Sequence, residues 1–209
     1  MRIFKRNRKD HWERVYQKHS SDQVGWYQIY PASSLKFIKN TRAGTDCRII
    51  DVGGGTSKLS ECLLDQGYTQ LSVLDISGKS LEKAKSQLGV ETNKIIWIEA
   101  DVTKHSFNAQ YDVWHDRAVF HFLTDAEERK GYLNSLDQAL RQNGHLIIAT
   151  FGLDAPPKCS GLSVVRYSPK SLQRELGDKF KIVETYLDNH VTPSGVTQNF
   201  VYCRFIKQA

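Results

Sequence analysis

Acidic residues beside a glycine turn are the part of this sequence with the clearest chemistry. Asp51 ends an apolar run, and a turn follows with three glycines in a row: Gly53, Gly54 and Gly55. Glycine lets a ligand approach the backbone closely, and the helix N-terminus expected after the turn favours an anionic group. Asp75, about twenty residues later, can accept both hydroxyls of a ribose, and Asp101 can accept from an exocyclic amine. These positions predict a site for an adenosine that carries a short charged chain.

The same turn with a later acid is also the fingerprint of dinucleotide-binding proteins. Here Lys58 stands where that fingerprint has its third glycine, and no Tyr-x-x-x-Lys pair is present for hydride transfer. A P-loop is excluded because no Gly-Lys-Ser/Thr follows the turn at the required spacing. The residues therefore favour an adenosyl ligand, and a nicotinamide-dependent oxidoreductase is the weaker alternative.

Strands alternating with helices must position these residues. Apolar runs predict five strands, at 47–52, 71–77, 95–102, 111–116 and 145–151. A loop rich in Pro and Gly then leads to a short helix that opens at Ser168 and Pro169. Residues 180–187 and 197–205 predict two further strands with no helix-length spacer between them. This order predicts an α/β fold with a doubly wound, mostly parallel sheet and at least one antiparallel pairing.

Helical patterns fill the intervals and the N-terminal region. Residues 10–19 and 33–39 predict two helices, joined by a loop that carries "GWYQIYP". Thr124 and Glu127 form a capping box for a long helix that we expect to end at Gly144. Its expected buried face is made of three leucines: Leu133, Leu136 and Leu140.

Composition and charge limit the class of protein. With 209 residues, 40% of them hydrophobic, the chain suits one domain, and no apolar run approaches the length of a membrane span. Four scattered cysteines and the lack of a signal peptide point to a reducing cytoplasm without a disulfide frame or a metal site. The net charge of +6 is concentrated in five early residues, namely Arg2, Lys5, Arg6, Arg8 and Lys9. They form either a solvated tail or a patch that steers an anionic partner.

Several of these segments resemble one known family. "IIDVGGGTS", the acid at Asp75, "EADV" and "YDVWHDRAVFHFLTD" look like the successive motifs of class I S-adenosylmethionine-dependent methyltransferases. The resemblance covers about Ile49 to Phe205 and implies a Rossmann-like, seven-stranded sheet with an antiparallel C-terminal strand. Ser57 departs from it, because many members have a further glycine there. The resemblance further implies that residues 1–45 form N-terminal helices and a lid over the cofactor and substrate site, and that residues 46–209 form the methyltransferase domain.

The resemblance also implies the cofactor, S-adenosylmethionine, which leaves as S-adenosylhomocysteine, and the residues that bind it. Asp51 and the glycines would cradle the methionine part, Asp75 the ribose, and Asp101 with Val102 the adenine. His115 or Asp116 would line the site where the fourth strand ends. The full implied set is Asp51, Gly53, Gly54, Gly55, Asp75, Ile76, Asp101, Val102, His115 and Asp116.

Methyl transfer from a sulfonium is an in-line displacement, so the protein must mainly align a nucleophile about 3 Å from the methyl group. A general base is needed only if the acceptor arrives protonated. His121 is a candidate base, although a lone histidine among aromatic residues is more often structural. Arg117 could bind an acceptor carboxylate, or pair with Asp116 or Asp125.

Two further segments are candidates for acceptor binding. Trp26 and Tyr27 could act as a lid with aromatic walls, or simply pack a helix against the sheet. The loop after the fifth strand offers three side chains, Cys159, Arg166 and Tyr167.

The identity of the acceptor is ambiguous at this stage. "WHDRAVF" resembles thiopurine-type small-molecule methyltransferases, whereas "HWERVYQKH" followed by "WYQ" resembles small protein lysine methyltransferases. No Asn/Asp-Pro-Pro-Tyr/Phe motif is present, which argues against methylation of adenine in nucleic acid. We favour a small-molecule acceptor and a monomer or weak dimer, with no membrane partner. A cofactor-binding scaffold that has lost catalysis is the alternative from another class.

Overall fold

The structure is a computed structural model that describes residues 7–208. Its core is a seven-stranded sheet in the order β3-β2-β1-β4-β5-β9-β8. The strands are β1 (Arg48–Val52), β2 (Gln70–Asp75), β3 (Ile95–Glu99), β4 (Tyr111–Arg117), β5 (Leu140–Phe151), β8 (Phe180–Val191) and β9 (Thr197–Lys207). The first five are parallel, and β9 runs antiparallel to both β5 and β8. The predicted Rossmann-like sheet with antiparallel C-terminal strands is confirmed.

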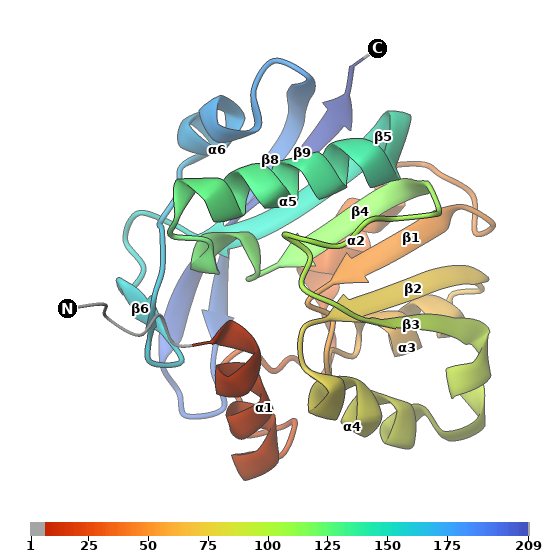
Figure 1. Ribbon diagram of the computed structural model, residues 1–209, viewed down its shortest axis with the longest axis vertical. Coiled ribbons are helices and arrows are strands. Elements are labelled where there is room, and N and C mark those ends of the chain that lie inside the picture. Colours follow the sequence, from red (N-terminus) through yellow and green to blue (C-terminus); the bar gives the residue numbers. More distant parts are fainter. Residues whose placement is uncertain (1–6, 209) are drawn as a thin grey trace.

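Helices cover both faces of this sheet (Figure 1). They are α1 (Arg8–Lys18), α2 (Ala32–Lys39), α3 (Leu59–Asp65), α4 (Gly78–Leu88), α5 (Ala126–Ala139) and α6 (Pro169–Leu176), with short 3₁₀ turns η1 (Gly89–Lys94) and η2 (Phe120–Phe122). One core cluster joins the sheet to α5 and α6, and a second joins it to α2, α3 and α4. Because both faces are covered, β1 and β4 are buried along most of their length.

The helix α5 departs from the sequence-based expectation at both ends. Its N-cap is Asp125, whose carboxylate accepts from the Glu127 backbone N–H, so Thr124 is not the cap. The helix ends at Ala139, and Leu140 already pairs with β4 as the first residue of β5. Gly144 therefore lies inside β5 and does not end the helix. The physical reason is that pairing of Leu140 with Tyr111 ends the helix, and an irregular turn at Asn143, which has φ 61°, lets the strand resume its register at residue 145.

Two smaller features were also not expected. The segment 100–110 between β3 and β4 contains no helix, so the alternation is interrupted there. The loop after β5 contains a short hairpin, made of β6 (Lys158–Cys159) and β7 (Leu162–Ser163). The hairpin lies over the same edge of the sheet as the carboxyl ends of the parallel strands, beside the start of α1 (Figure 1).

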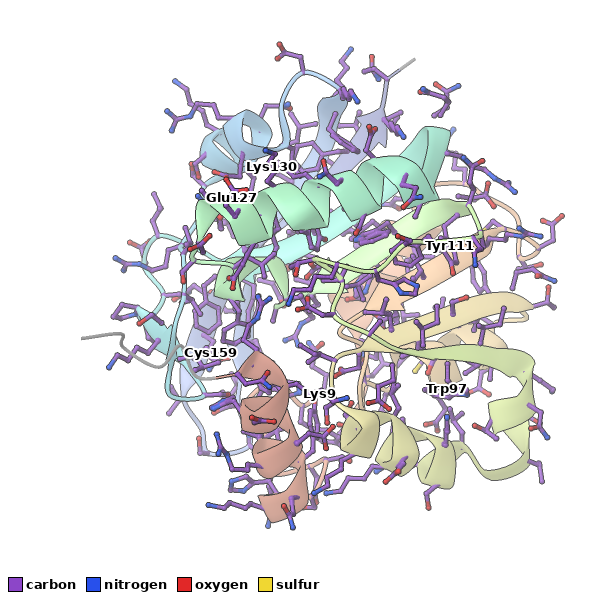
Figure 2. All side chains as sticks on the ribbon, in the orientation of Figure 1. Lys9, Trp97, Tyr111, Glu127, Lys130 and Cys159 are labelled. Atoms are coloured by element: carbon purple, nitrogen blue, oxygen red, sulfur yellow. The ribbon has the colours of Figure 1, made fainter. Side chains whose placement is uncertain are left out.

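The helix α1 is fastened across those carboxyl ends by polar contacts. Glu13 accepts from the Gly78 backbone N–H at 2.7 Å, and Lys83 donates to the His19 carbonyl at 2.8 Å. Lys9, labelled in Figure 2, forms an ion pair with Glu99 at the end of β3. These contacts place α1 as a cover over the strand ends.

The basic N-terminal cluster is partly explained by these contacts. Arg8 and Lys9 are paired with acids and are not part of a solvated tail. Arg2, Lys5 and Arg6 lie outside the described residues, so the charge-steering hypothesis stays a prediction. No helix within residues 7–208 is long and apolar enough to cross a membrane. The division of the chain at residue 45 likewise stays a prediction.

Candidate cofactor and acceptor site

One cavity of about 90 Å³ lies under α1 at the carboxyl ends of the parallel strands. On the side of β1, β2 and β3 its walls include what we call the acidic end, made of Gly53, Asp75, Ile76, Asp101 and Val102. Toward β4 and β9 its walls include what we call the aromatic end, made of Trp12, Trp26, Arg117, Phe122, Cys159, Gln198 and Phe200. The two ends are continuous, so a ligand at one can touch a ligand at the other.

The glycine turn at the acidic end admits no larger side chain. Gly53 has φ +69°, and a Cβ there would lie 2.1 Å from Cγ2 of Val119. Gly55 has φ +40°, and its Cβ would lie 2.8 Å from both the Asp75 carboxylate and the Tyr16 hydroxyl. Glycine is thus required by conformation and by space, and the bare backbone of Gly53 is left facing the cavity.

Asp75 is a buried carboxylate at the end of β2. Only 5% of it is exposed, and its Oδ1 accepts from the Ser77 backbone N–H at 2.8 Å. Burial raises the pKa of Asp75 to about 7, and hydrogen bonds from Ser77 and Ser80 limit the rise. A group that donates hydrogen bonds to this carboxylate would favour its charged form.

Asp101 connects the acidic end to α1. Its Oδ1 accepts from the backbone and the hydroxyl of Thr103, and its Oδ2 lies 3.4 Å from Nη2 of Arg8. Arg8 also lies 3.4 Å from Glu128 of α5. This arginine ties α1 both to the loop after β3 and to α5.

A second, smaller hollow of about 30 Å³ lies behind the glycine turn, and we call it the polar pocket. His115 lines it, with Nδ1 at 2.7 Å from Oδ1 of Asp51 and Nε2 at 2.9 Å from the Ser34 hydroxyl. His115 therefore fixes the orientation of Asp51, and Ser34 of α2 fixes His115. Nothing in the sequence pattern pointed to Ser34. Tyr27 also lines the polar pocket and is not among the walls of the main cavity.

Arg117 ends β4 and touches both hollows. Its Nη1 donates to the Trp26 carbonyl at 3.0 Å, and its guanidinium carbon lies 4.6 Å from the centre of the Phe200 ring. The alternative of a pair with Asp116 is wrong, because the Asp116 carboxylate accepts from the Tyr132 hydroxyl and from two backbone N–H groups of the following turn. No ion pair joins Arg117 to Asp125 or to any other carboxylate of the described chain.

Five of the predicted site residues line neither the main cavity nor the polar pocket, namely Gly55, Asp116, His121, Arg166 and Tyr167. Asp116 is fully buried and shapes the turn after β4. His121 is fully buried among aromatic rings, with Nδ1 accepting from the Phe151 backbone N–H at 3.2 Å. Burial, aided by the charge of Arg117, lowers the pKa of His121 to about 3, so it is neutral. Tyr167 packs in the core, and Arg166 donates to two carbonyls of its own loop.

The aromatic end contains residues that the motifs did not reveal. Trp12 of α1 packs edge-on against Trp26 at 5.5 Å and against Phe122 at 5.1 Å between ring centres. Gln198 and Phe200 come from β9, and Cys159, labelled in Figure 2, comes from β6. Burial raises the pKa of the Cys159 thiol, which is therefore protonated. The spacing of apolar residues indicated a helix and a strand here, but not that they face one cavity.

A comparison with protein families decides the identity of this site. The family model described as Nodulation protein S (NodS) matches residues 26–156, which include the glycine turn, Asp75, Asp101 and Arg117. The chain belongs to the NodS family of class I S-adenosylmethionine-dependent methyltransferases. No group of three or more metal-binding side chains is present within residues 7–208.

Relatives of this NodS-family chain differ in the molecules they methylate. The chain is 28% identical over 143 residues to the eEF1A lysine and N-terminal methyltransferase of Bos taurus, and the matched region covers 66% of this chain and 20% of the relative. It is 26% identical over 141 residues to a malonyl-acyl-carrier protein O-methyltransferase of Ilyobacter polytropus, covering 67% of this chain and 48% of the relative. The chain thus spans a fifth to a half of the length of these curated relatives.

Solved structures confirm the fold of the NodS-family chain. The N-methyltransferase NodS from Bradyrhizobium japonicum, solved in complex with S-adenosyl-L-homocysteine, superposes with a TM-score of 0.70 at 14% identity, over 96% of this chain and 100% of that one. A methyltransferase from Anabaena variabilis gives a TM-score of 0.72 at 16% identity, over 97% and 96% of the two chains. At sequence identities this low, the superpositions show that the folds are alike and say nothing about the acceptor.

Proposed function

We propose that this chain transfers a methyl group from S-adenosylmethionine to a small-molecule acceptor held at the aromatic end. The observation that carries the proposal is the continuity of the cavity. A glycine turn with two acids lies at one end, and a covered aromatic hollow without acids lies at the other. The reacting atoms would meet between Gly53 and Arg117, where the two ends join.

The acidic end fits the cofactor. The turn at Gly53 and Gly55 has no room for a Cβ, and the bare backbone of Gly53 lines the cavity, which suits close approach of the methionine part. Asp75 would accept from the ribose hydroxyls, and Asp101 with Val102 would hold the adenine. The polar pocket lies behind the turn, where Asp51 and Thr56 would meet the amino-acid end. When bound, the cofactor supplies an electrophilic methyl group on a sulfonium.

The aromatic end fits a compact acceptor that needs no general base. Among its described walls there is no carboxylate and no histidine, and the thiol of Cys159 is protonated. His121 cannot serve as the base, since it is buried and its Nδ1 already accepts a hydrogen bond. The chain therefore contributes alignment and exclusion of water, with Trp12, Trp26 and Phe122 enclosing the nucleophile.

A protein lysine is the second candidate acceptor. It is supported by the similarity to the eEF1A lysine and N-terminal methyltransferase. A lysine ammonium must lose a proton before it can attack a methyl group, and the described walls of the aromatic end offer no acid or histidine to take it. We therefore rank this acceptor below a small molecule.

Calorimetric titration with S-adenosylmethionine, S-adenosylhomocysteine and NADH is the first test. We expect micromolar binding of the two adenosyl ligands and no binding of NADH. The Asp75→Asn variant should bind the adenosyl ligands more weakly, and the control Asp65→Asn, at an exposed position, should bind them as the wild type does. A tritiated methyl donor then tests thiols, carboxylates, amines and protein lysates as acceptors. Transfer to proteins alone would favour the lysine acceptor. Binding without transfer to any class would favour the non-catalytic scaffold.

A further inference from the structure

Arg117 differs in its surroundings from the other partly buried arginines of the described chain. Arg8, Arg129, Arg141 and Arg204 each form an ion pair with a carboxylate. Arg117 forms none within residues 7–208, and its Nε and Nη2 are buried without a hydrogen-bond partner. A buried guanidinium with unused donors is unfavourable unless something else compensates its charge. Within the described residues, Arg117 is thus a cation that forms no ion pair with a carboxylate.

The unused donors of Arg117 have the geometry of a carboxylate site. Nη1 is occupied by the Trp26 carbonyl at 3.0 Å, which leaves Nε and Nη2 unused. These two nitrogens lie on one edge of the planar guanidinium, and their parallel N–H groups match the two oxygens of a carboxylate. The Phe200 ring, 4.6 Å away, fixes the plane of the guanidinium from β9.

One carboxylate, Asp188 of β8, lies in the same surroundings as Arg117: it pairs across the sheet with Phe200, its charge also acts on His190 and Tyr202, and its buried Oδ2 has no hydrogen-bond partner. The charge of Arg117 shifts the pKa values of four groups, namely His121, Cys159, His190 and Tyr202. Burial keeps the two histidines uncharged and the thiol and phenol protonated, because it is the largest effect on each of their pKa values. The Tyr202 hydroxyl contacts Ser34 at 3.3 Å, and a weaker hydrogen bond with Arg117 also lowers its pKa. None of these four groups carries a negative charge, and Asp188 forms no ion pair with the guanidinium within residues 7–208.

We propose that the methyl acceptor is an anionic small molecule, and that Arg117 binds its carboxylate through Nε and Nη2. This inference rests on the proposed function and names the substrate class of the same site. The apolar part of the acceptor packs between Trp12 and Trp26, and the Gln198 amide lies on the same wall. A cationic amine is disfavoured here, because the guanidinium repels it and the face of Phe200 is already occupied.

The carboxylate of the cofactor is the competing occupant, since Arg117 also touches the polar pocket. Two observations favour the acceptor. The guanidinium is stacked on Phe200 of β9, on the side of the aromatic end. The polar pocket has its own groups for a cofactor carboxylate, including Thr56, Ser57 and the turn at Gly54.

The test uses benzoate and neutral benzamide as matched probes of the full-length protein saturated with S-adenosylhomocysteine. We expect benzoate to bind the wild type at least about tenfold more tightly than benzamide, and Arg117→Gln to lose this preference. Arg117→Lys keeps the charge but lacks the pair of parallel N–H donors, and should retain only part of the preference for benzoate. The exposed Arg174→Gln is the matched control and should behave as wild type. Equal binding of the two probes to the wild type, no binding of either, or a preference that persists in Arg117→Gln would overturn the proposal.

A second measurement separates this proposal from the cofactor assignment. Wild type and Arg117→Gln are titrated with S-adenosylhomocysteine and with 5′-methylthioadenosine, which lacks the amino-acid end. We expect both ligands to bind the variant within about twofold of wild type. If only S-adenosylhomocysteine weakens, Arg117 holds the carboxylate of the cofactor and the acceptor proposal fails. If neither ligand binds the wild type, the proposed function fails, and the benzoate preference, measured without cofactor, still tests the anion site. A thermal unfolding curve confirms that the variant is folded.

Discussion

The acidic end and the aromatic end of the cavity share one space but are built differently. The acidic end comes from the carboxyl ends of β1, β2 and β3, and all its residues lie between Gly53 and Val102. The aromatic end combines α1, the loop before α2, the end of β4, the hairpin β6 and the strand β9, which spread over almost the whole chain. Parallel strands joined by short crossovers bring their ends together automatically. The aromatic end depends on how distant segments pack, so it can differ between relatives that share the acidic end.

The largest effect we expect is at the acidic end, from Gly53→Ala. The new Cβ would lie 2.1 Å from the Val119 side chain at φ +69°, so both strain and overlap oppose it. We expect a loss of about 2–4 kcal/mol in the free energy of unfolding, with no measurable binding of S-adenosylhomocysteine. Gly67→Ala is the matched control, because Gly67 also has a positive φ but has open space around it. It should lose only about 1 kcal/mol and keep its affinity. Equal losses of stability and of affinity in the two variants would contradict the requirement for glycine at position 53.

Asp75→Asn should weaken binding of S-adenosylhomocysteine by about 2–3 kcal/mol, the scale of charge-assisted hydrogen bonds. Because burial raises the pKa of Asp75 to about 7, the wild type should also bind the ligand less tightly as the pH falls from 8 to 6. The asparagine variant should lose this slope. Calorimetry at several pH values measures both effects, and a slope that survives in the variant would assign it to another group.

The same carboxylate makes the stability of the empty protein change with pH in the opposite direction. The pKa of Asp75 is about 7 when folded, against the ordinary value of 3.8, so the folded chain holds more protons between these values. The free energy of unfolding should therefore fall as the pH rises from 4 to 7, by up to about 4 kcal/mol from this group. Urea unfolding of wild type and Asp75→Asn at pH 5 and pH 8 isolates the contribution. A difference between them that does not change with pH would refute the assignment.

At the aromatic end, Trp12→Ala should act on turnover and not on cofactor binding. The variant loses edge-on contacts with Trp26 and Phe122, each worth about 1 kcal/mol, so we expect about a tenfold drop in kcat/KM for the acceptor. Trp97→Ala is the control of equal size, because Trp97 lies on β3, far from Cys159 in Figure 2, and is not a wall of the cavity. A loss of affinity for S-adenosylhomocysteine as large as the loss of turnover would show that the two ends are not separate.

The smallest effect we expect is from Arg8→Ala, which removes the tie between α1 and both Asp101 and Glu128. The side chains in these ion pairs are about a fifth to a quarter exposed, so the pairs contribute about 1 kcal/mol or less. We expect faster dissociation of S-adenosylhomocysteine, by up to about fivefold, and a weaker dependence of that rate on salt. Stopped-flow displacement measures it, with Lys94→Ala, which breaks the exposed pair with Glu91, as the control. If the dissociation rate did not change, Arg8 would not be holding α1 over the cavity.

Two predictions from the sequence were wrong: the end of α5 at Gly144 and the pairing of Arg117 with Asp116. Gly144 is a good helix terminator by pattern, yet pairing of Leu140 with Tyr111 of β4 ends the helix at Ala139. Asp116 stands next to Arg117 in sequence, but neighbours on a strand point to opposite faces, and Asp116 satisfies the turn after β4. In both cases a tertiary contact outweighed a local preference.

The sequence by itself determined the sheet, its antiparallel end and the acids beside the glycine turn. Those features depend on periodicity and on residues that neighbouring βαβ units bring together over short separations. Only the tertiary structure decided that Arg117 lies over Phe200 without an ion pair to any described residue and that Trp12 covers the cavity. The register that pairs Phe151 with Phe200 places β9 beside the site, and it joins residues whose separation no local pattern encodes. The proposed cofactor site is therefore local in this chain, whereas the proposed acceptor site depends on long-range packing.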